Sequence, residues 1–212
     1  MNWKGKAKMA KNRRGKFIVF EGIDGAGKET QANLLLTYFK RHKKPVEKLA
    51  YPDKRAKVGK LIYKYLYGTH ILAPQAQFLL HLADFVKDQE KIRSWLNKGK
   101  TVIADRYFTS TLAYQGAQGF PTSKALLLAK TLDIVRPDLV IFLKVSPAIS
   151  LRRKQKAKKL LDRNEKDKKF LGKVEKFYEK MIKSQTLAKW FLVEGERPKG
   201  EVFSAVKSVL KV

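Results

Sequence analysis

A glycine-rich turn lies near the start of the chain, between a short apolar segment and a segment that favours a helix. Residues 17–20, Phe-Ile-Val-Phe, have the aromatic and β-branched side chains of a strand. Residues 22–30, Gly-Ile-Asp-Gly-Ala-Gly-Lys-Glu-Thr, follow, and residues 31–43 then place apolar side chains on one helical face. Strand, glycine-rich loop and helix in this order are the setting of a phosphate-binding loop. A turn that binds nothing is the weaker alternative, because strand, glycine spacing, lysine and helix all agree.

The residue types of this loop suit the phosphate groups of a nucleotide. Glycines let backbone N–H groups converge, and a helix N-terminus adds partial positive charge. We expect the phosphate ligands to be Gly22, Gly25, Ala26, Gly27, Lys28, Glu29 and Thr30. Lys28 is placed to reach the β and γ phosphates. The strict motif has Ser or Thr directly after the lysine to bind Mg²⁺, whereas this chain has Glu29 there. Three alternatives stay open: Glu29 binds the metal, Thr30 binds it, or Asp105 and the nucleotide hold it.

The rest of the chain alternates strands with helices. Apolar segments at 46–50, 101–104, 139–143 and 191–193 predict four more strands. Helical patterns are expected at 58–67, 74–98, 123–135, 170–181 and 201–210, with a further helix starting at Ser146-Pro147. Residues 154–159 form a basic stretch that we expect to be mobile. This alternation predicts an α/β fold with a mostly parallel sheet.

Composition limits the kinds of protein that this chain can be. Its 212 residues suit one domain with a real core, and no apolar run approaches the roughly 18 residues of a membrane span. The absence of cysteine excludes disulfides, thiolate catalysis and cysteine-ligated zinc, and it fits a reducing cytoplasm. Residues 1–16 are basic and lack the apolar segment of a secretory signal. We therefore expect a basic disordered tail at 1–16 and one folded domain at 17–212.

The charge of the chain is extreme. There are 47 Lys and Arg residues against 19 Asp and Glu, which gives a formal net charge of +28. Such a charge attracts phosphates, nucleotides, nucleic acid or acidic membrane surfaces. A lysine-rich proteome or an adaptation to heat or salt is an equal alternative.

The segment after the third strand resembles a known family. Asp105-Arg106-Tyr107, followed by Ser110 and by Ala-Tyr-Gln at 113–115, is similar to the corresponding segment of thymidylate kinases, as is the glycine-rich loop. Three further stretches share this resemblance, at 51–61, 136–143 and 161–174. It spans residues 17–212. It implies a three-layer α/β P-loop NTPase fold with a five-stranded parallel sheet and a short helical lid at about 150–165.

The resemblance also implies an activity. It is the ATP-dependent phosphorylation of dTMP to dTDP for dTTP synthesis, with ATP as donor and Mg²⁺ as cofactor. A homodimer in the cytoplasm is expected, without membrane contact, and the basic tail is the segment through which nucleic acid would bind.

The resemblance implies roles for the residues that match the family pattern. Lys28, Asp105, Arg106 and Arg153 are implied to be catalytic. Asp24 would accept the 3′-hydroxyl of the acceptor sugar, Asp105 would hold Mg²⁺ through water, and Arg106 would grip the acceptor phosphate. The alternatives are a turn-stabilising Asp24 and a plain strand-end ion pair between Asp105 and Arg106.

The acceptor site and the lid complete the implied set. Acceptor-binding residues are Asp24, Tyr51, Lys54, Arg55, His81, Phe85, Arg106, Ser110, Thr111, Tyr114 and Gln115, and lid residues are Arg153, Arg163 and Glu165. Tyr114 would exclude a ribose 2′-hydroxyl, or it is a plain core residue. Lys54 stands where relatives carry an arginine, with Arg55 beside it; either could be a solvated charge.

One part of the pattern departs from the family. Relatives stack an aromatic ring on thymine and use an arginine four residues later to bond a base carbonyl. Those positions are His81 and Phe85 here, and Phe85 cannot donate these bonds. The sequence therefore leaves open a related kinase with another nucleotide or nucleoside acceptor. A basic nucleic-acid-binding P-loop protein is the alternative of another class, which the charge would explain directly.

Overall fold

The computed structural model describes residues 14–69, 71–158 and 160–212. Its centre is a parallel sheet of five strands in the order β2-β3-β1-β4-β5. The strands are β1 (Phe17–Glu21), β2 (Val46–Ala50), β3 (Thr101–Asp105), β4 (Leu139–Lys144) and β5 (Lys189–Glu194). The predicted α/β fold with a five-stranded parallel sheet is thus confirmed.

Strand β1 is buried on both faces, and its alternating side chains divide the interior into two cores. Phe17 and Val19 belong to one apolar cluster, and Ile18 and Phe20 belong to the other. A strand buried on both faces has no polar side, which explains the continuous apolar run in the sequence. The central position of β1 also brings its carboxyl end, where the glycine-rich loop begins, to the middle of the sheet edge.

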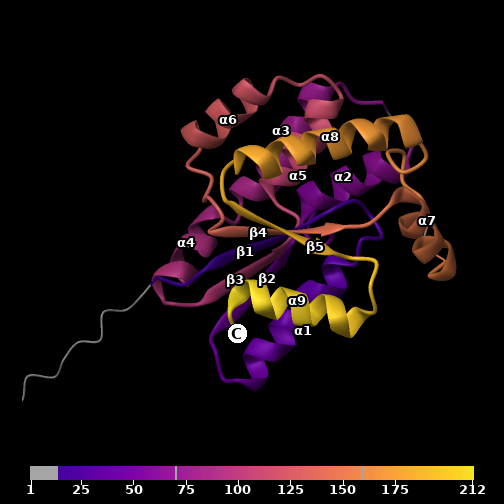
Figure 1. The fold of residues 1–212 in the computed structure, drawn as a ribbon. Coiled ribbons are helices and arrows are strands. Elements are labelled where there is room, and N and C mark those ends of the chain that lie inside the picture. Colours follow the sequence, from indigo (N-terminus) through magenta and orange to yellow (C-terminus); the bar gives the residue numbers. More distant parts are fainter. Residues whose placement is uncertain (1–13, 70, 159) are drawn as a thin grey trace, which may run out of the picture.

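Helices cover both faces of the sheet and form three layers (Figure 1). They are α1 (Lys28–Arg41), α2 (Lys57–Tyr67), α3 (Pro74–Val86), α4 (Gln89–Asn97), α5 (Phe108–Ala117), α6 (Thr122–Thr131), α7 (Pro147–Lys156), α8 (Lys168–Ser184) and α9 (Lys199–Leu210). Figure 1 shows α1 and α9 together below the sheet, with α3, α5 and α8 above it. Helix α7 stands at the side, next to the carboxyl end of β4. Within the described ranges, no helix is long and apolar enough to cross a membrane.

The structure corrects the helix expected at 74–98, which is two helices. Helix α3 ends at Val86 and α4 begins at Gln89. The break turns the Gln89 side chain inward, where its Nε2 donates to the Phe85 carbonyl at 2.6 Å. Its Oε1 accepts from the Tyr107 hydroxyl at 3.1 Å and from the Val135 N–H at 2.8 Å. A continuous amphipathic pattern could not reveal this break, because two of the three partners, Tyr107 and Val135, come from other segments.

Two further segments are more ordered than their charge indicated. Arg14 donates to Asp138 at 2.9 Å and the Gly15 N–H donates to the Leu96 carbonyl at 2.8 Å, so the folded part includes residues ahead of Phe17. The remainder of the expected tail, residues 1–13, lies outside the described residues. In the stretch expected to be mobile, residues 154–156 belong to α7, and Lys154 is buried.

Candidate functional site

The glycine-rich loop forms a cradle between β1 and α1. Gly22 and Gly25 have φ angles of +140° and +77°, and a Cβ at either position would lie 2.7 Å from the Leu143 carbonyl or the Ser150 hydroxyl oxygen. Only glycine fits both the conformation and the close approach. Among the described side chains, none caps the N-terminus of α1. Its first N–H groups are therefore available to an anion.

Lys28 is the first residue of α1 and lies over this cradle. Its Nζ donates to the Ile23 carbonyl at 2.8 Å and lies 4.0 Å from the Asp24 carboxylate. Burial and the nearby Arg106 lower the pKa of Lys28 to about 8. The ammonium group is thus poorly compensated without a ligand, which favours the arrival of a phosphate beside it.

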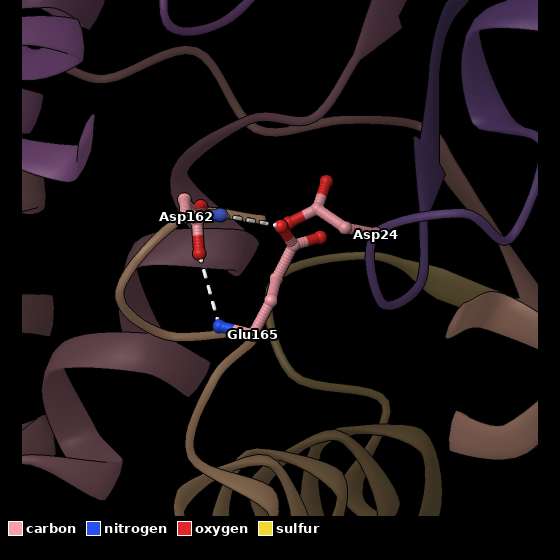
Figure 2. Close-up of side chains that lie close together, drawn as sticks. All are labelled: Asp24, Asp162 and Glu165. Atoms are coloured by element: carbon pink, nitrogen blue, oxygen red, sulfur yellow. Dashed lines mark hydrogen bonds between the residues drawn. The ribbon is translucent and has the colours of Figure 1, made fainter. Parts of the chain in front are cut away.

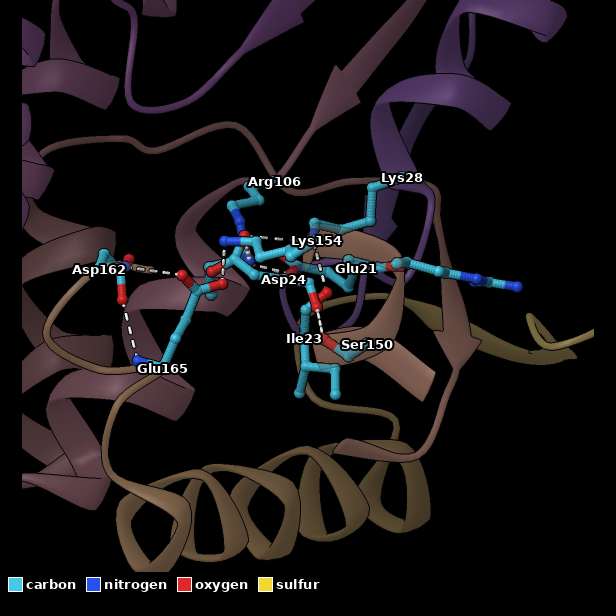
Figure 3. Close-up of polar contacts among 12 residues, drawn as sticks. Glu21, Ile23, Asp24, Lys28, Arg106, Ser150, Lys154, Asp162 and Glu165 are labelled. Atoms are coloured by element: carbon cyan, nitrogen blue, oxygen red, sulfur yellow. Dashed lines mark hydrogen bonds and ion pairs between the residues drawn. The ribbon is translucent and has the colours of Figure 1, made fainter. Parts of the chain in front are cut away.

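Arg106 joins the loop to the segment after β3 (Figure 3). Its guanidinium donates to Asp24 Oδ1 at 2.8 Å and to Ser110 Oγ at 3.1 Å, and it lies 5.4 Å from the centre of the Tyr114 ring. Burial disfavours the Asp24 carboxylate, but Arg106, Lys28 and Lys154 together hold the pKa of Asp24 well below its usual value. An arginine in this position offers a fork of donors to a second anion.

A buried carboxylate that sequence reasoning missed holds this segment in place. Glu21, at the end of β1, is fully buried and accepts from the Thr109 hydroxyl at 2.7 Å and the Ser110 hydroxyl at 2.6 Å. The Tyr107 N–H at 3.2 Å and the Tyr178 hydroxyl at 2.8 Å are further donors to it. An acid that closes an otherwise apolar strand was the available signal.

A pocket lies beside Arg106. Predicted acceptor residues that line it are Asp24, Tyr51, His81, Phe85, Arg106, Ser110, Thr111, Tyr114 and Gln115. Two polar atoms of its wall, Tyr114 Oη and Gln115 Oε1, are buried and have no hydrogen-bond partner among the described residues. Burial and Arg106 lower the pKa of His81 to about 4, so its imidazole is neutral at pH 7.

Phe85 forms part of the apolar wall of this pocket. Its ring lies 4.9 Å from that of Tyr51 and 5.3 Å from that of Tyr107, in edge-to-face geometry. It therefore contributes packing and no hydrogen bond at the position where the family pattern has an arginine.

Lys54 and Arg55 do not line this pocket. They line a larger adjoining cleft, which also contains the glycine-rich loop, Asp105 and Arg153. The Lys54 ammonium lies 5.0 Å from the centre of the Tyr63 ring, and the Arg55 side chain is 93% exposed. Both cations therefore line the cleft, and their described contacts do not hold them at the pocket.

The lid consists of α7 and the segment that leads from it to α8. Arg153 donates to the Gly195 carbonyl at 2.8 Å and to the Gly25 carbonyl at 3.4 Å, which ties the loop to the turn after β5. Arg163 instead donates to the Gly68 carbonyl at 2.9 Å and lies 4.0 Å from the Tyr65 ring. Of the two predicted lid arginines, Arg153 contacts the glycine-rich loop.

Three carboxylates from the loop and the lid converge (Figure 2). Oxygen atoms of Asp24, Asp162 and Glu165 lie within 4.8 Å of one another. Burial, Asp24 and Glu165 raise the pKa of Asp162 to about 7, which a divalent cation would reverse. Lys154 forms an ion pair with Glu165 and so closes the cluster from the α7 side (Figure 3). Asp162 and Lys154 had no role in the sequence prediction.

The predicted metal residues form a second, separate set. Asp105 ends β3, and burial raises its pKa although Lys28 and Arg106 oppose that effect. Glu29 and Thr30 lie exposed in the first turn of α1 and line the same cleft. All of these oxygen atoms are of the kind that Mg²⁺ prefers.

Comparison with known proteins identifies the family. The family model described as thymidylate kinase matches residues 20–206. Thymidylate kinases from Thermosipho africanus and Carboxydothermus hydrogenoformans are each 34% identical; the alignments cover 92% and 93% of this chain and 97% and 98% of those proteins. A solved structure of thymidylate kinase from Candida albicans superimposes with a TM-score of 0.73 at 27% identity, covering 93% of this chain and 92% of that one. A chain that matches this family model over most of its length, and these relatives over nearly all of theirs, belongs to the thymidylate kinase family.

Proposed function

We propose that this protein transfers the γ-phosphoryl group of ATP to dTMP and produces dTDP and ADP. The observation that carries the proposal is the position of Arg106. Its guanidinium stands between the phosphate loop and the adjoining pocket, bound to Asp24 on one side and to Ser110 on the other. A phosphorylated acceptor in the pocket would meet this cation, whereas a nucleoside has no phosphate for it to hold.

The geometry supports a transfer by alignment and charge neutralisation. ATP phosphates bind the free N–H groups of the loop and Lys28, and the acceptor sugar's 3′-hydroxyl donates to Asp24. Arg106 then exchanges its bond with Asp24 for the acceptor phosphate. An oxygen of that phosphate attacks the γ-phosphorus, and the bond from that phosphorus to the ADP oxygen breaks. Lys28, 4.0 Å from Asp24, lies close enough to accompany the transferring group.

Magnesium has two sets of candidate ligands in this proposal. Asp105, Glu29 and Thr30 face the cleft at the first turn of α1, and Asp24, Asp162 and Glu165 converge between loop and lid. When bound, Mg²⁺ neutralises phosphate charge and orients the two phosphate groups. The chain's own contribution is to present carboxylates at both sides of the transferring group.

A different acceptor base is the second candidate. Phe85 is apolar and His81 is neutral, so neither supplies the strong donor of an arginine. The Gln115 carboxamide, with its unpartnered Oε1, is a polar group of the pocket wall that can read a base edge. Its donor and acceptor suit the N3–H and O4 of thymine or uracil. A methyl group at C5 fits the apolar wall that Phe85 provides.

An acceptor panel tests the proposal. Phosphoryl transfer from ATP with Mg²⁺ would be measured separately with dTMP, dUMP, dCMP, dGMP, dAMP and UMP, and with thymidine as a nucleoside control. We expect dTMP to be the preferred acceptor and thymidine to be inactive. Preferred turnover of another monophosphate would rename the substrate and keep the mechanism. Absence of turnover with every acceptor would refute the kinase function and favour the nucleic-acid-binding alternative.

Assembly and location belong to the same proposal. Leu61 on α2 and Leu79 and Val86 on α3 are exposed apolar side chains on two helices that pack together. We propose that a second copy covers this surface in a homodimer in the cytoplasm. Replacement of Leu61 and Leu79 by Ser should shift the mass measured by sedimentation from dimer to monomer.

A further inference from the structure

One lysine and three aspartates form a network at the junction of α3 and α4. Lys87 Nζ lies 2.6 Å from Asp88 Oδ2, 3.1 Å from Asp84 Oδ1 and 3.6 Å from Asp53 Oδ2. The same ammonium group donates to the Asp84 carbonyl at 3.0 Å and lies 5.0 Å from the centre of the Tyr51 ring. The Lys87 ammonium thus contacts carboxylates at the α3–α4 junction and in the loop that follows β2.

The electrostatics of this network depend on Lys87. The Asp84 side chain is 0% exposed, and burial raises its pKa. Partial burial disfavours the ammonium, but hydrogen bonds to Asp88 and Asp84 outweigh it and raise the pKa of Lys87. Arg55 is the other cation nearby, with its Nε 3.7 Å from Asp53, and its side chain is almost fully exposed. Without Lys87, a buried carboxylate would stand uncompensated beside two others, which is strongly unfavourable.

The carboxylates in turn hold the segment at 51–53. The Tyr51 hydroxyl donates to Asp88 Oδ2 at 3.1 Å, and the Asp53 N–H donates to Asp84 Oδ2 at 2.9 Å. Tyr51 and Pro52 form part of the wall of the acceptor pocket, and Lys54 follows in the cleft. Both ends of this wall segment are therefore fixed by acids that Lys87 neutralises.

We propose that Lys87 is a positioning residue for acceptor binding. It does not itself line the pocket or the cleft in the described part of the chain. It acts through Asp84 and Asp88, which hold the Tyr51–Asp53 segment against the pocket. The inference rests on the proposed function, because it concerns the acceptor side of that reaction and leaves the ATP side unchanged.

The test compares acceptor and donor kinetics in matched variants. Lys87→Met should raise the KM for dTMP roughly tenfold, because the pocket wall shifts, and leave the KM for ATP unchanged. Lys87→Arg keeps the positive charge and should restore a dTMP KM near that of the wild type. Lys91→Met is the control, since Lys91 lies over the Trp95 ring on α4 and away from the three aspartates. It should change neither constant.

Hydrogen exchange gives a readout that needs no turnover. Amides at 51–55 should exchange faster in Lys87→Met, while those of β1 keep their protection. If Lys87→Met does not fold, the variant with Asp88→Asn added removes one uncompensated charge and should show the same acceptor-selective KM. An unchanged dTMP KM with unchanged exchange at 51–55, or an equal rise in both KM values with protection lost throughout, would overturn the role of Lys87. Absence of dTMP turnover in the wild type would refute only the proposed substrate, and the exchange result would still decide on Lys87.

Discussion

Lys28 lies where its charge is unfavourable until a phosphate binds. It is buried, its Nζ meets the Ile23 carbonyl, and Arg106 adds a second positive charge to the desolvation that lowers its pKa to about 8. An anion beside it favours the charged form, so ATP binding should take up a proton near that pH. ATP affinity should therefore fall as the pH rises from about 7 to about 9.

Calorimetry in two buffers of different ionisation enthalpy measures this proton uptake directly. We expect uptake at pH values near the pKa of Lys28 and little of it well below that value. Lys28→Met is the control and should abolish the uptake; persistence of the same uptake in that variant would exclude Lys28 as its source.

The stability of the free protein should depend on pH with the opposite sign to ATP affinity. The unfolded lysine keeps its proton up to its ordinary pKa of 10.5, so the free energy of unfolding should rise with pH between 8 and 10.5.

Arg106 differs from a simple positive charge because it meets three groups at once. Its two terminal nitrogens reach Asp24 and Ser110, and its plane lies over the ring of Tyr114. A lysine cannot reproduce this fork. Arg106→Lys should lower kcat/KM for dTMP by roughly 100- to 1000-fold with little change in the midpoint of thermal unfolding. Arg14→Lys, at the exposed pair with Asp138, is the matched control and should keep full activity. Activity of Arg106→Lys close to the wild type would remove Arg106 from the mechanism.

The residues of the acceptor pocket could be predicted, whereas those that support it could not. Arg106 follows a strand whose carboxyl end meets the glycine-rich loop, and the family resemblance implied a site role for both Arg106 and Ser110. For Glu21 the only signal was an acid at the end of an apolar strand, which does not show what that acid binds. Its four donors come from α5, from the residue before α5 and from α8, and only the tertiary fold brings them to one carboxylate.

At the scale of elements, Gln89 determines where one helix ends and the next begins. Its carboxamide bonds the Phe85 carbonyl, the Tyr107 hydroxyl and the Val135 N–H, and its side chain is buried. Gln89→Leu would leave the Tyr107 hydroxyl and the Val135 N–H without a partner among the described residues, whereas the Phe85 carbonyl would keep its bond from the Asp88 N–H. It should lower the free energy of unfolding by about 2–4 kcal/mol, measured by urea denaturation. Gln75→Leu on the exposed face of α3 should change it by less than about 0.5 kcal/mol. Equal stability of the two variants would contradict this role.

The end of α7 shows why charge composition is a poor guide to burial. Lys154 belongs to a run of basic residues, and such runs commonly form a solvated surface. Here Glu165 reaches back from the segment after α7 and forms an ion pair with it, while Asp162 donates its N–H to Glu165 at 2.8 Å. The acid that orders Lys154 is eleven positions away, beyond the reach of any local pattern. Sequence periodicity could therefore locate α7 and could not show that its end faces the site.

At the scale of the whole molecule, the α/β fold class could be predicted from the alternation of strands and helices. All five strands occur where apolar segments predicted them, within one or two residues. Periodicity did not determine their spatial order β2-β3-β1-β4-β5, because side-chain patterns identify a buried strand and not its neighbour. The family resemblance implied the architecture. Departures at the α3–α4 junction, in the first residues of the folded part and at the end of α7 involve side chains from distant segments. Helix ends differ as well: α1 begins at Lys28 instead of 31, and α6 ends at Thr131 instead of 135.

The net charge of +28 acts on the molecule as a whole. Positive groups that outnumber negative ones by this margin repel one another in the compact state more than in the expanded unfolded chain. Salt screens such repulsion over a distance of about 10 Å at 0.1 M ionic strength. The midpoint of thermal unfolding should therefore rise when NaCl is increased from about 10 mM to about 150 mM. Chloride could also stabilise the fold by binding the phosphate loop, and Lys28→Met separates the two effects. The same rise of the midpoint in Lys28→Met would assign the stabilisation to screening of general repulsion. Loss of the rise in that variant would assign it to chloride at the loop. A fall of the wild-type midpoint would show that favourable ion pairs outweigh the repulsion.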